Sequence, residues 1–316
     1  MRNIIISICV LFLLLLLAIC YGFQQEHHVA DYTKDSNKEA TVNSLTCSFS
    51  QDSLCPSEEV IVDNYVASKH PEVILHREAY TISFNSETHN ANWVGWHLTK
   101  EHLDGNYSRK GVPYYCDDGV ACGIGRVTSE TCKGSYFADV EVGQGKLDLD
   151  DWSNNAYGMS HGHLCPAGDC KWSAKAMNQS FLLTNMCPQH PSLNNGAWRV
   201  LEELCRKWAR KHGDIYIVAG PIFVDNTPKT FGETNIAVPD AFFKVIFILK
   251  AEVRVPEIPS EINTTVHYKG NKAWAIGFVY PNDGTNHSMQ ECCRSLKEIE
   301  TLTKMCVSPD MAISYK

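Results

Sequence analysis

The segment between residues 160 and 213 constrains the fold of this chain more than any other part of its sequence. Two histidines, His161 and His163, flank a glycine in a short extended stretch, and a second apolar stretch ends at Asn185. From Asn194 onward, apolar side chains recur at steps of three and four, which predicts an amphipathic helix. The segment is therefore expected to fold as strand, strand and helix, an order that can place a histidine opposite an asparagine amide.

This helix carries start and stop signals of its own. Asn194 or Asn195 is expected to cap its first turn, because a side-chain oxygen at that position accepts a hydrogen bond from an unpaired backbone N–H. Basic residues fill the last turns, where cations suit the helix dipole, and Gly213 is a natural stop.

Short runs rich in Val, Ile and aromatic residues lie on both sides of this helix and predict the strands of a sheet. These runs cover residues 80–84, 93–98, 215–219, 242–249 and 273–280. A second helix is expected near residues 293–306. Because strands flank the helices without a regular βαβ alternation, the sequence predicts an α+β fold.

An uncharged apolar segment at residues 4–21 follows a single basic residue, Arg2. The pattern predicts an export signal over residues 1–22, which is either removed as a signal peptide or kept as a membrane anchor. Residues 23–70 are polar and are expected to form a lead-in or stalk, ahead of an ordered domain over residues 71–316. We therefore expect a protein that is secreted, periplasmic or anchored in a membrane and facing outside.

The cysteine count agrees with an oxidising compartment. Of 14 cysteines, Cys9 and Cys20 fall in the export segment, which leaves an even number for a disulfide framework whose pairing the sequence does not assign. Zinc is the competing use, because Cys165 and Cys170 follow His161 and His163 closely. However, the chain has no CxxC pair, and this spacing matches no closed structural zinc site.

The charge of the chain is acidic as a whole and basic in one segment. Lys and Arg number 28 against 36 Asp and Glu, yet the stretch from Asp169 to His212 holds seven basic and only three acidic side chains. A local basic patch of this kind can hold backbone phosphates without reading bases. A solvated basic helix face is the alternative explanation.

Three linked blocks between residues 160 and 206 are specific enough to indicate a family. They are Gly162-His163 with Pro166-Ala167, then Thr184-Asn185-Met186-Cys187-Pro188-Gln189, then Asn194, Gly196, Trp198, Glu202 and Arg206. Together they resemble the DNA/RNA non-specific endonucleases of the ββα-metal (His-Me finger) class. The resemblance covers roughly residues 75–305 and implies an α+β fold with a mixed or antiparallel sheet and flanking helices.

The resemblance also implies a role for each matching residue. His163 would be the general base that takes a proton from the attacking water, and Asn194 would bind Mg²⁺ directly, with Mn²⁺ as a possible substitute. Glu202 would orient the metal-bound waters, and Arg206 would hold a phosphate oxygen. Asn185 would support the region of His163 by hydrogen bonding. The alternatives are a plain helix cap for Asn194 and an ordinary i,i+4 surface pair for Glu202 and Arg206.

One position departs from the family pattern. The family has Asp-Arg before Gly-His, whereas this chain has Ser160-His161. Because histidine carries charge only in mildly acidic solution, we expect His161 to contact phosphate in its protonated form, with a contribution that fades as the pH rises.

The sequence as a whole predicts an exported, Mg²⁺-dependent endonuclease that hydrolyses DNA and RNA, with 5′-phosphate and 3′-hydroxyl products as the resemblance implies. Residues 71–316 would form its catalytic domain, and DNA and RNA would bind through their backbone phosphates. One rival is a catalytically silent extracellular nucleic-acid-binding protein on the same scaffold. Another is a zinc-dependent hydrolase that uses His161 and His163. The sequence does not determine an oligomeric state.

Overall fold

The computed structural model describes most of the chain from Pro71 onward. The described residues are 71–109, 113–115, 121–124, 127–128, 133–134, 136–139, 141–142, 152, 155–224, 227–249, 264–269 and 271–312. The expected export segment and lead-in lie outside them, so the domain boundary at residue 71 stays a prediction. In this part of the chain, no helix has the length and apolar character needed to cross a membrane.

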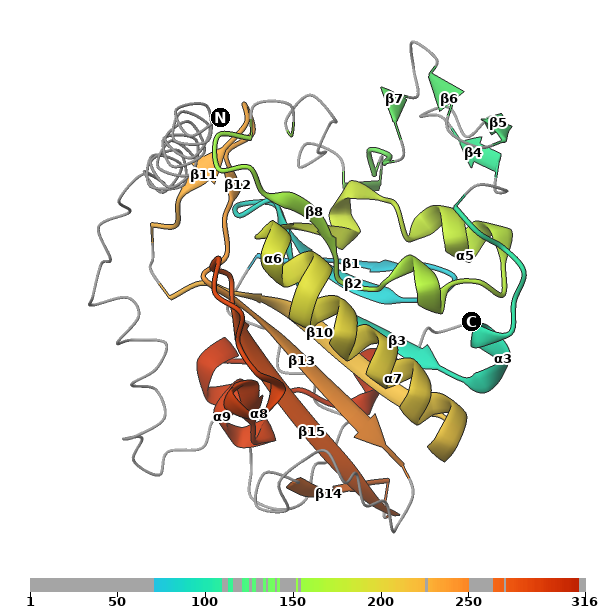
Figure 1. Ribbon diagram of the computed structural model, residues 1–316, viewed down its shortest axis with the longest axis vertical. Coiled ribbons are helices and arrows are strands. Elements are labelled where there is room, and N and C mark those ends of the chain that lie inside the picture. Colours follow the sequence, from blue (N-terminus) through green and yellow to red (C-terminus); the bar gives the residue numbers. More distant parts are fainter. Residues whose placement is uncertain are drawn as a thin grey trace, which may run out of the picture. The chain divides into compact units, whose positions relative to one another are not determined.

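Eight strands of the described part form an antiparallel sheet (Figure 1). Their spatial order is β1, β2, β3, β10, β13, β15 and β14, and β16 also pairs with β15. Their bounds are Val73–His76 for β1, Thr81–Asn85 for β2, Asn90–Leu98 for β3, Ile215–Ile222 for β10, Ala241–Ile248 for β13, Thr264–Tyr268 for β14, Asn271–Pro281 for β15 and Cys293–Arg294 for β16. The five expected apolar runs all fall on these strands, because branched and aromatic side chains pack well on a pleated surface.

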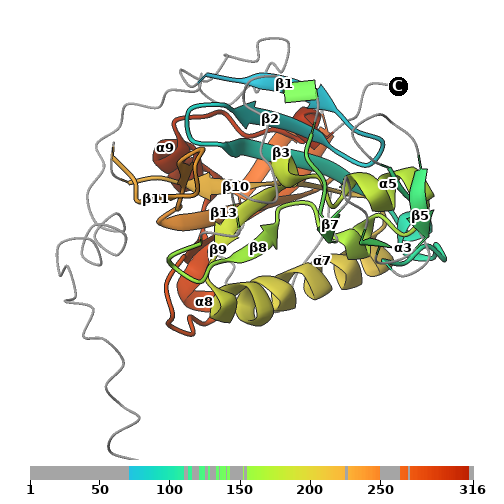
Figure 2. The ribbon, with the colours of Figure 1, turned by 90° about the horizontal axis from the view of Figure 1, so that it is seen from above.

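Both faces of this sheet are covered, which explains why strand β13 is buried along its whole length. Alternate residues of a strand point to opposite faces, and Phe242 and Phe243 accordingly belong to two separate clusters of buried side chains. Helix α7 (Arg199–His212) packs into the first cluster and helix α9 (Leu296–Thr303) into the second, on opposite sides of the sheet (Figure 2).

The expected strand, strand and helix unit is confirmed. Strands β8 (Ser160–His163) and β9 (Met186–Gln189) pair antiparallel, with His163 opposite Met186. Between them lie three short helices: η2 (Ala167–Asp169), α5 (Ala174–Gln179) and η3 (Leu183–Asn185). Helix α7 follows and ends at Gly213, whose φ of 86° favours glycine.

The expected cap at Asn194 or Asn195 is wrong. A short helix, α6 (Pro191–Leu193), begins earlier and is capped by His190, whose side chain accepts a hydrogen bond from the Ser192 amide at 3.2 Å. A π-type turn, η4 (Asn194–Trp198), then joins α6 to α7 and is interrupted by a non-helical Gly196. Asn194 therefore lies inside an irregular helix, where its side chain is not needed as a cap.

The second expected helix is confirmed as α9 (Leu296–Thr303), and a separate short helix precedes it. Helix α8 (Met289–Cys292) ends before β16, and α9 starts at Leu296 after a capping box of Ser295 and Glu298. The remaining described elements are short: α3 (Lys100–Leu103), β4 (Pro113–Tyr115), β5 (Ala121–Ile124), β6 (Val127–Thr128), β7 (Lys133–Gly134), β11 (Thr230–Phe231), β12 (Ile236–Ala237) and η5 (Pro309–Ala312). An antiparallel sheet with helices on its faces is an α+β fold, as expected.

The described cysteines include both thiols and a disulfide. Cys306 is disulfide-bonded. Six others are free and buried: Cys165, Cys170, Cys187, Cys205, Cys292 and Cys293. The cysteines around the three sequence blocks are thus buried thiols in this structure, and the rest of the expected framework lies outside the described residues.

Candidate active site

A pocket of about 510 Å³ lies between strand β8, turn η2 and the start of helix α7. Five of the six predicted site residues line it: His161, His163, Asn194, Glu202 and Arg206. The sixth, Asn185, is fully buried and does not line the pocket. The local unit of two strands and a helix accounts for this convergence, because β8 ends where α7 begins to cross it.

His163 occupies the last position of β8, with its ring in the pocket wall. The Trp198 indole donates a hydrogen bond to the His163 carbonyl oxygen at 3.2 Å, and the Phe181 ring meets the imidazole edge to face at 5.3 Å between ring centroids. Burial lowers the pKa of His163 to about 3, assisted by the positive charge of Arg109. The ring is therefore neutral in any ordinary buffer, and its Nε2 makes no hydrogen bond to the described part of the chain. A neutral imidazole with an unused nitrogen can accept a proton.

Asn185 fixes the turn that follows His163. Its backbone oxygen accepts from the Leu164 amide at 3.0 Å, and its side-chain oxygen accepts from the Cys165 amide at 3.0 Å. Its side-chain nitrogen donates to the carbonyl oxygens of Cys165 and Ser180, each at 2.9 Å. Three of these bonds hold the backbone of Leu164 and Cys165 directly after His163, and the fourth ties Asn185 to Ser180, so they fix the end of β8.

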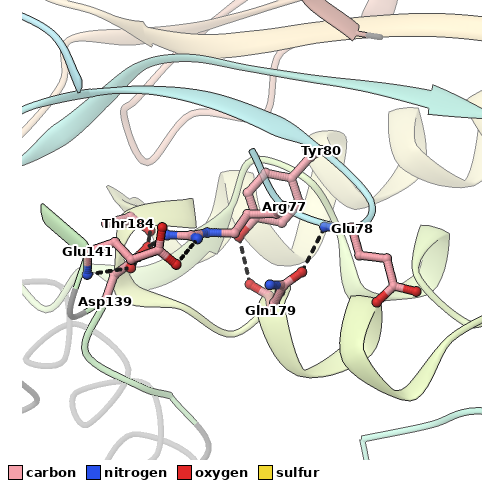
Figure 3. Close-up of polar contacts among 7 residues, drawn as sticks. All are labelled: Arg77, Glu78, Tyr80, Asp139, Glu141, Gln179 and Thr184. Carbon is pink, nitrogen blue, oxygen red and sulfur yellow. Dashed lines mark hydrogen bonds and ion pairs between the residues drawn. The ribbon is translucent and has the colours of Figure 1, made fainter. Parts of the chain in front are cut away.

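A buried ion pair between Arg77 and Asp139 anchors the segment that carries Asn185 (Figure 3). Arg77, just after β1, donates to both carboxylate oxygens of Asp139 at 2.7 Å, and both side chains are 3% exposed. Asp139 also accepts from the Thr184 hydroxyl at 2.7 Å, next to Asn185 in the chain. Tyr80 adds a hydrogen bond to the Gln179 carbonyl at 2.7 Å. The hairpin of β1 and β2 thus holds in place the segment that carries Asn185.

His161 lies in an aromatic stack. Its ring is sandwiched between Tyr136, at 4.2 Å between centroids, and Trp152, at 4.0 Å, with interplanar angles of 8° and 20°. Burial lowers its pKa to about 4. The ring without a bound phosphate is therefore neutral in mildly acidic solution, and the expected contact of a protonated His161 with phosphate stays a prediction. His161 still lines the pocket, as an uncharged ring in place of the family's arginine.

Asn194 and Glu202 supply oxygen atoms to the pocket. Neither side chain makes a hydrogen bond or ion pair with another described residue. The neighbouring Asn195 differs, because its side-chain amide donates to the Pro191 carbonyl oxygen at 3.0 Å. Burial raises the pKa of Glu202 to about 7, and the positive charge of Lys244 opposes this shift. An amide and a carboxylate oxygen without protein partners suit Mg²⁺, which prefers oxygen ligands and retains several waters. The residues present therefore fit a divalent cation.

Arg206 is held at the pocket by an acidic residue from η2. Its Nη1 donates to Asp169 at 2.9 Å, and the other oxygen of this carboxylate accepts from the Trp96 indole at 3.0 Å. The alternative of a surface i,i+4 pair with Glu202 is not observed, whereas Arg199 and Glu203 do form such a pair on the exposed side of the helix. Arg206 is thereby presented to the pocket from a buried anchor.

The sequence of residues 57–310 matches the profile of the DNA/RNA non-specific endonucleases. The chain belongs to this family. Its relatives include human mitochondrial endonuclease G, which is 31% identical over 181 residues, covering 54% of this chain and 53% of the relative. Nuclease C1 of Cunninghamella echinulata is 32% identical over 183 residues, covering 55% and 64%. The chain thus spans between about half and two thirds of the length of these relatives.

A solved structure of the same family supports the fold. The crystal structure of the EndoG/EndoGI complex superposes with a TM-score of 0.56 at 19% identity, covering 76% of this chain and 87% of that one. At this level of identity the likeness shows the fold alone, and it agrees with the α+β class.

Arg109, Tyr136 and Trp152 belong to the surroundings of this family site, and the sequence reasoning did not identify them. The guanidinium of Arg109 lies 4.7 Å from the centroid of the Phe181 ring and lines the pocket. It precedes β8 by about fifty residues, in a stretch with no periodicity or motif. Tyr136 and Trp152 likewise carry no local signal, because their role as a slot for His161 arises only from tertiary packing.

Proposed function

We propose that this chain is a metal-dependent endonuclease that hydrolyses phosphodiester bonds of DNA and RNA, with Mg²⁺ as its metal and Mn²⁺ as a substitute. One observation carries the proposal: a neutral His163 shares a pocket with the cations Arg206 and Arg109 and with the side-chain oxygens of Asn194 and Glu202, which have no partner among the described residues. Phosphodiester hydrolysis needs these three elements, namely a base for water, a cation site and positive charge for the phosphate.

In the proposed reaction, Nε2 of His163 accepts a proton from a water molecule as its oxygen attacks the phosphorus atom. The bond from phosphorus to the 3′-oxygen breaks, and this oxygen takes up a proton from a solvent water molecule, which leaves 5′-phosphate and 3′-hydroxyl ends. Arg206, braced by Asp169, donates to a phosphate oxygen. Asn194 and Glu202 would hold the metal and its waters. When bound, the metal supplies positive charge for the pentacovalent phosphate and the leaving oxygen.

The substrate class follows from where the charges lie. Lys175, Lys207 and Lys211 are exposed on α5 and α7, in the basic segment of an otherwise acidic chain, and Arg109, Arg199 and Arg206 line the pocket itself. Ammonium groups on a helix surface bind phosphates without reading bases, so cleavage of both DNA and RNA should be insensitive to sequence and sensitive to salt.

We also propose that the protein is exported, although several of its relatives are mitochondrial by name. The apolar segment at residues 4–21 and the disulfide at Cys306 support an oxidising destination. Whether residues 1–22 are removed or serve as an anchor is decided by N-terminal sequencing of protein recovered from the source.

A plasmid-nicking assay tests the proposed function. Supercoiled DNA and a single-stranded RNA are incubated with the purified chain in Mg²⁺, in EDTA and in Zn²⁺. Cleavage of both substrates in Mg²⁺ and loss of cleavage in EDTA are expected. Cleavage with Zn²⁺ alone would favour a zinc hydrolase using His161 and His163. Binding without cleavage under all three conditions would instead show the silent binding protein.

A further inference from the structure

Lys244 is a buried charge that the proposed reaction does not use. It lies in the middle of β13, whose eight residues are all buried, and its own exposure is 0%. Its ammonium makes no hydrogen bond to the described part of the chain. An ammonium without hydrogen bonds in a protein interior is costly, since it has lost its water and gained no equivalent partner. A methionine of similar length would fill the same space without this cost.

The surroundings of the ammonium connect it to both halves of the candidate active site. Nζ lies 4.1 Å from the ring centroid of Trp198 and 5.5 Å from that of Trp96, within the range of cation–π attraction. The Trp198 indole donates to the carbonyl of His163 at 3.2 Å. The Trp96 indole donates to Asp169 at 3.0 Å, and Asp169 in turn holds Arg206.

Each of the two indoles therefore connects Lys244 with a residue of the proposed reaction. One route leads to the strand that carries His163 and the other to the acidic residue that braces Arg206. A cation on the face of an indole fixes the ring and draws electron density from it, which strengthens its N–H as a donor. Its charge also opposes the burial that raises the pKa of Asp169 and Glu202.

We propose that Lys244 is a positioning residue for phosphodiester cleavage: through the two indoles, its buried charge sets the places of His163 and Arg206. The inference rests on the proposed function. Lys244 itself does not line the pocket and touches no substrate.

The test compares Lys244→Met with Lys244→Arg. Methionine keeps the length of the stem and removes the charge, so kcat should fall on the order of 10- to 100-fold, the scale of a small misplacement of reacting groups. Its melting temperature should stay close to that of the wild type, because the cost of burying an ammonium without hydrogen bonds is removed while Asp169 keeps its ion pair with Arg206. Lys244→Arg should recover most of kcat. Lys269→Met, at a lysine whose side chain is 61% exposed, is the control and should match the wild type.

A second readout does not depend on catalysis. In NMR spectra, the indole N–H signals of Trp96 and Trp198 should shift and lose protection from hydrogen exchange in Lys244→Met. If Lys244→Met does not fold, Trp198→Phe keeps the aromatic face, removes the N–H donor and should lower kcat in the same way. The proposal is overturned if Lys244→Met is folded with unchanged kcat and unchanged indole signals. It is equally overturned if both Lys244 variants lose activity only in step with their melting temperature. A wild type without nuclease activity refutes the proposed function instead. The indole signals then still decide whether Lys244 holds the two indoles in place.

Discussion

Glu202 is the group whose ionisation we expect to set the pH dependence of cleavage. Burial raises its pKa from 4.5 to about 7, a shift that corresponds to about 3 kcal/mol against the carboxylate. One pH unit below that pKa, only about a tenth of the molecules carry the carboxylate. If the ionised form holds the metal waters, kcat/KM should fall about tenfold between roughly pH 8 and pH 6. His163 adds nothing to this fall, because its pKa of about 3 leaves it neutral throughout.

The assay is the initial rate of supercoiled plasmid conversion at subsaturating DNA, measured across this pH range at several Mg²⁺ concentrations. A bound cation favours the carboxylate over the acid, so the acid limb should move to lower pH as Mg²⁺ is raised. Glu202→Gln should lose this limb together with most of its activity. Glu203→Gln is the matched control, because the Glu203 carboxylate is next in the chain but does not line the pocket. An acid limb that ignores Mg²⁺, or that survives in Glu202→Gln, would refute the reasoning.

Four further outcomes are expected. His163→Ala should lower kcat by about 10² to 10⁴ while DNA binding in EDTA stays near normal, and near-normal cleavage would remove this histidine from the mechanism. Asn194→Ala should raise the Mg²⁺ concentration needed for half-maximal rate, whereas an unchanged metal titration would contradict a ligand role. The pKa of Glu202 is raised in the folded protein, so the contribution of this carboxyl group to stability is complete below its unfolded pKa of 4.5 and is lost as the pH rises through about 7. Glu202→Gln should therefore unfold at a higher denaturant concentration than the wild type near pH 8. Reduction of the disulfide at Cys306 should lower the free energy of unfolding by about 2 to 4 kcal/mol, measured by denaturant titration with and without reductant.

The parts of the site that the sequence predicts are those encoded within one segment. Strands β8 and β9 and helix α7 follow one another within about fifty residues, and each has a periodicity that can be read locally. The path of the backbone between them then brings His163, Asn194 and Glu202 to one pocket.

The start of the helix could not be predicted, because two signals compete there. Asn194 is a good capping residue, yet Pro191 is equally good as the first residue of a helix, and it follows His190. The structure starts the helix at Pro191, which frees Asn194 for the pocket. A tertiary contact favours the earlier start of the helix. The backbone amide of His190 donates to the Asn282 side chain at 2.7 Å, ninety-two positions away, and holds the residue that caps α6.

Lys244 and Arg109 show a different limit of sequence reasoning. In an alternating strand, a lysine is normally read as a solvent-facing position, but β13 is covered on both faces and its lysine points into the core. Arg109 lies in a stretch without a motif, yet it lines the pocket although it is about fifty positions before β8. No local pattern encodes either contact.

The other cations of the pocket bear on why His161 can stand where the family pattern has an arginine. Under the proposed function the pocket binds phosphate and needs cations, and the family pattern supplies one of them beside the histidine proposed as the base. Here that position is a neutral ring between Tyr136 and Trp152, while Arg206 and Arg109 line the same pocket. An additional permanent cation two residues from His163 would lower the pKa of the base further, since Arg109 already acts in that direction. His161→Arg should therefore bind DNA more tightly than the wild type without a higher kcat, and a kcat that rises in step with affinity would show that the missing cation had limited the chemical step.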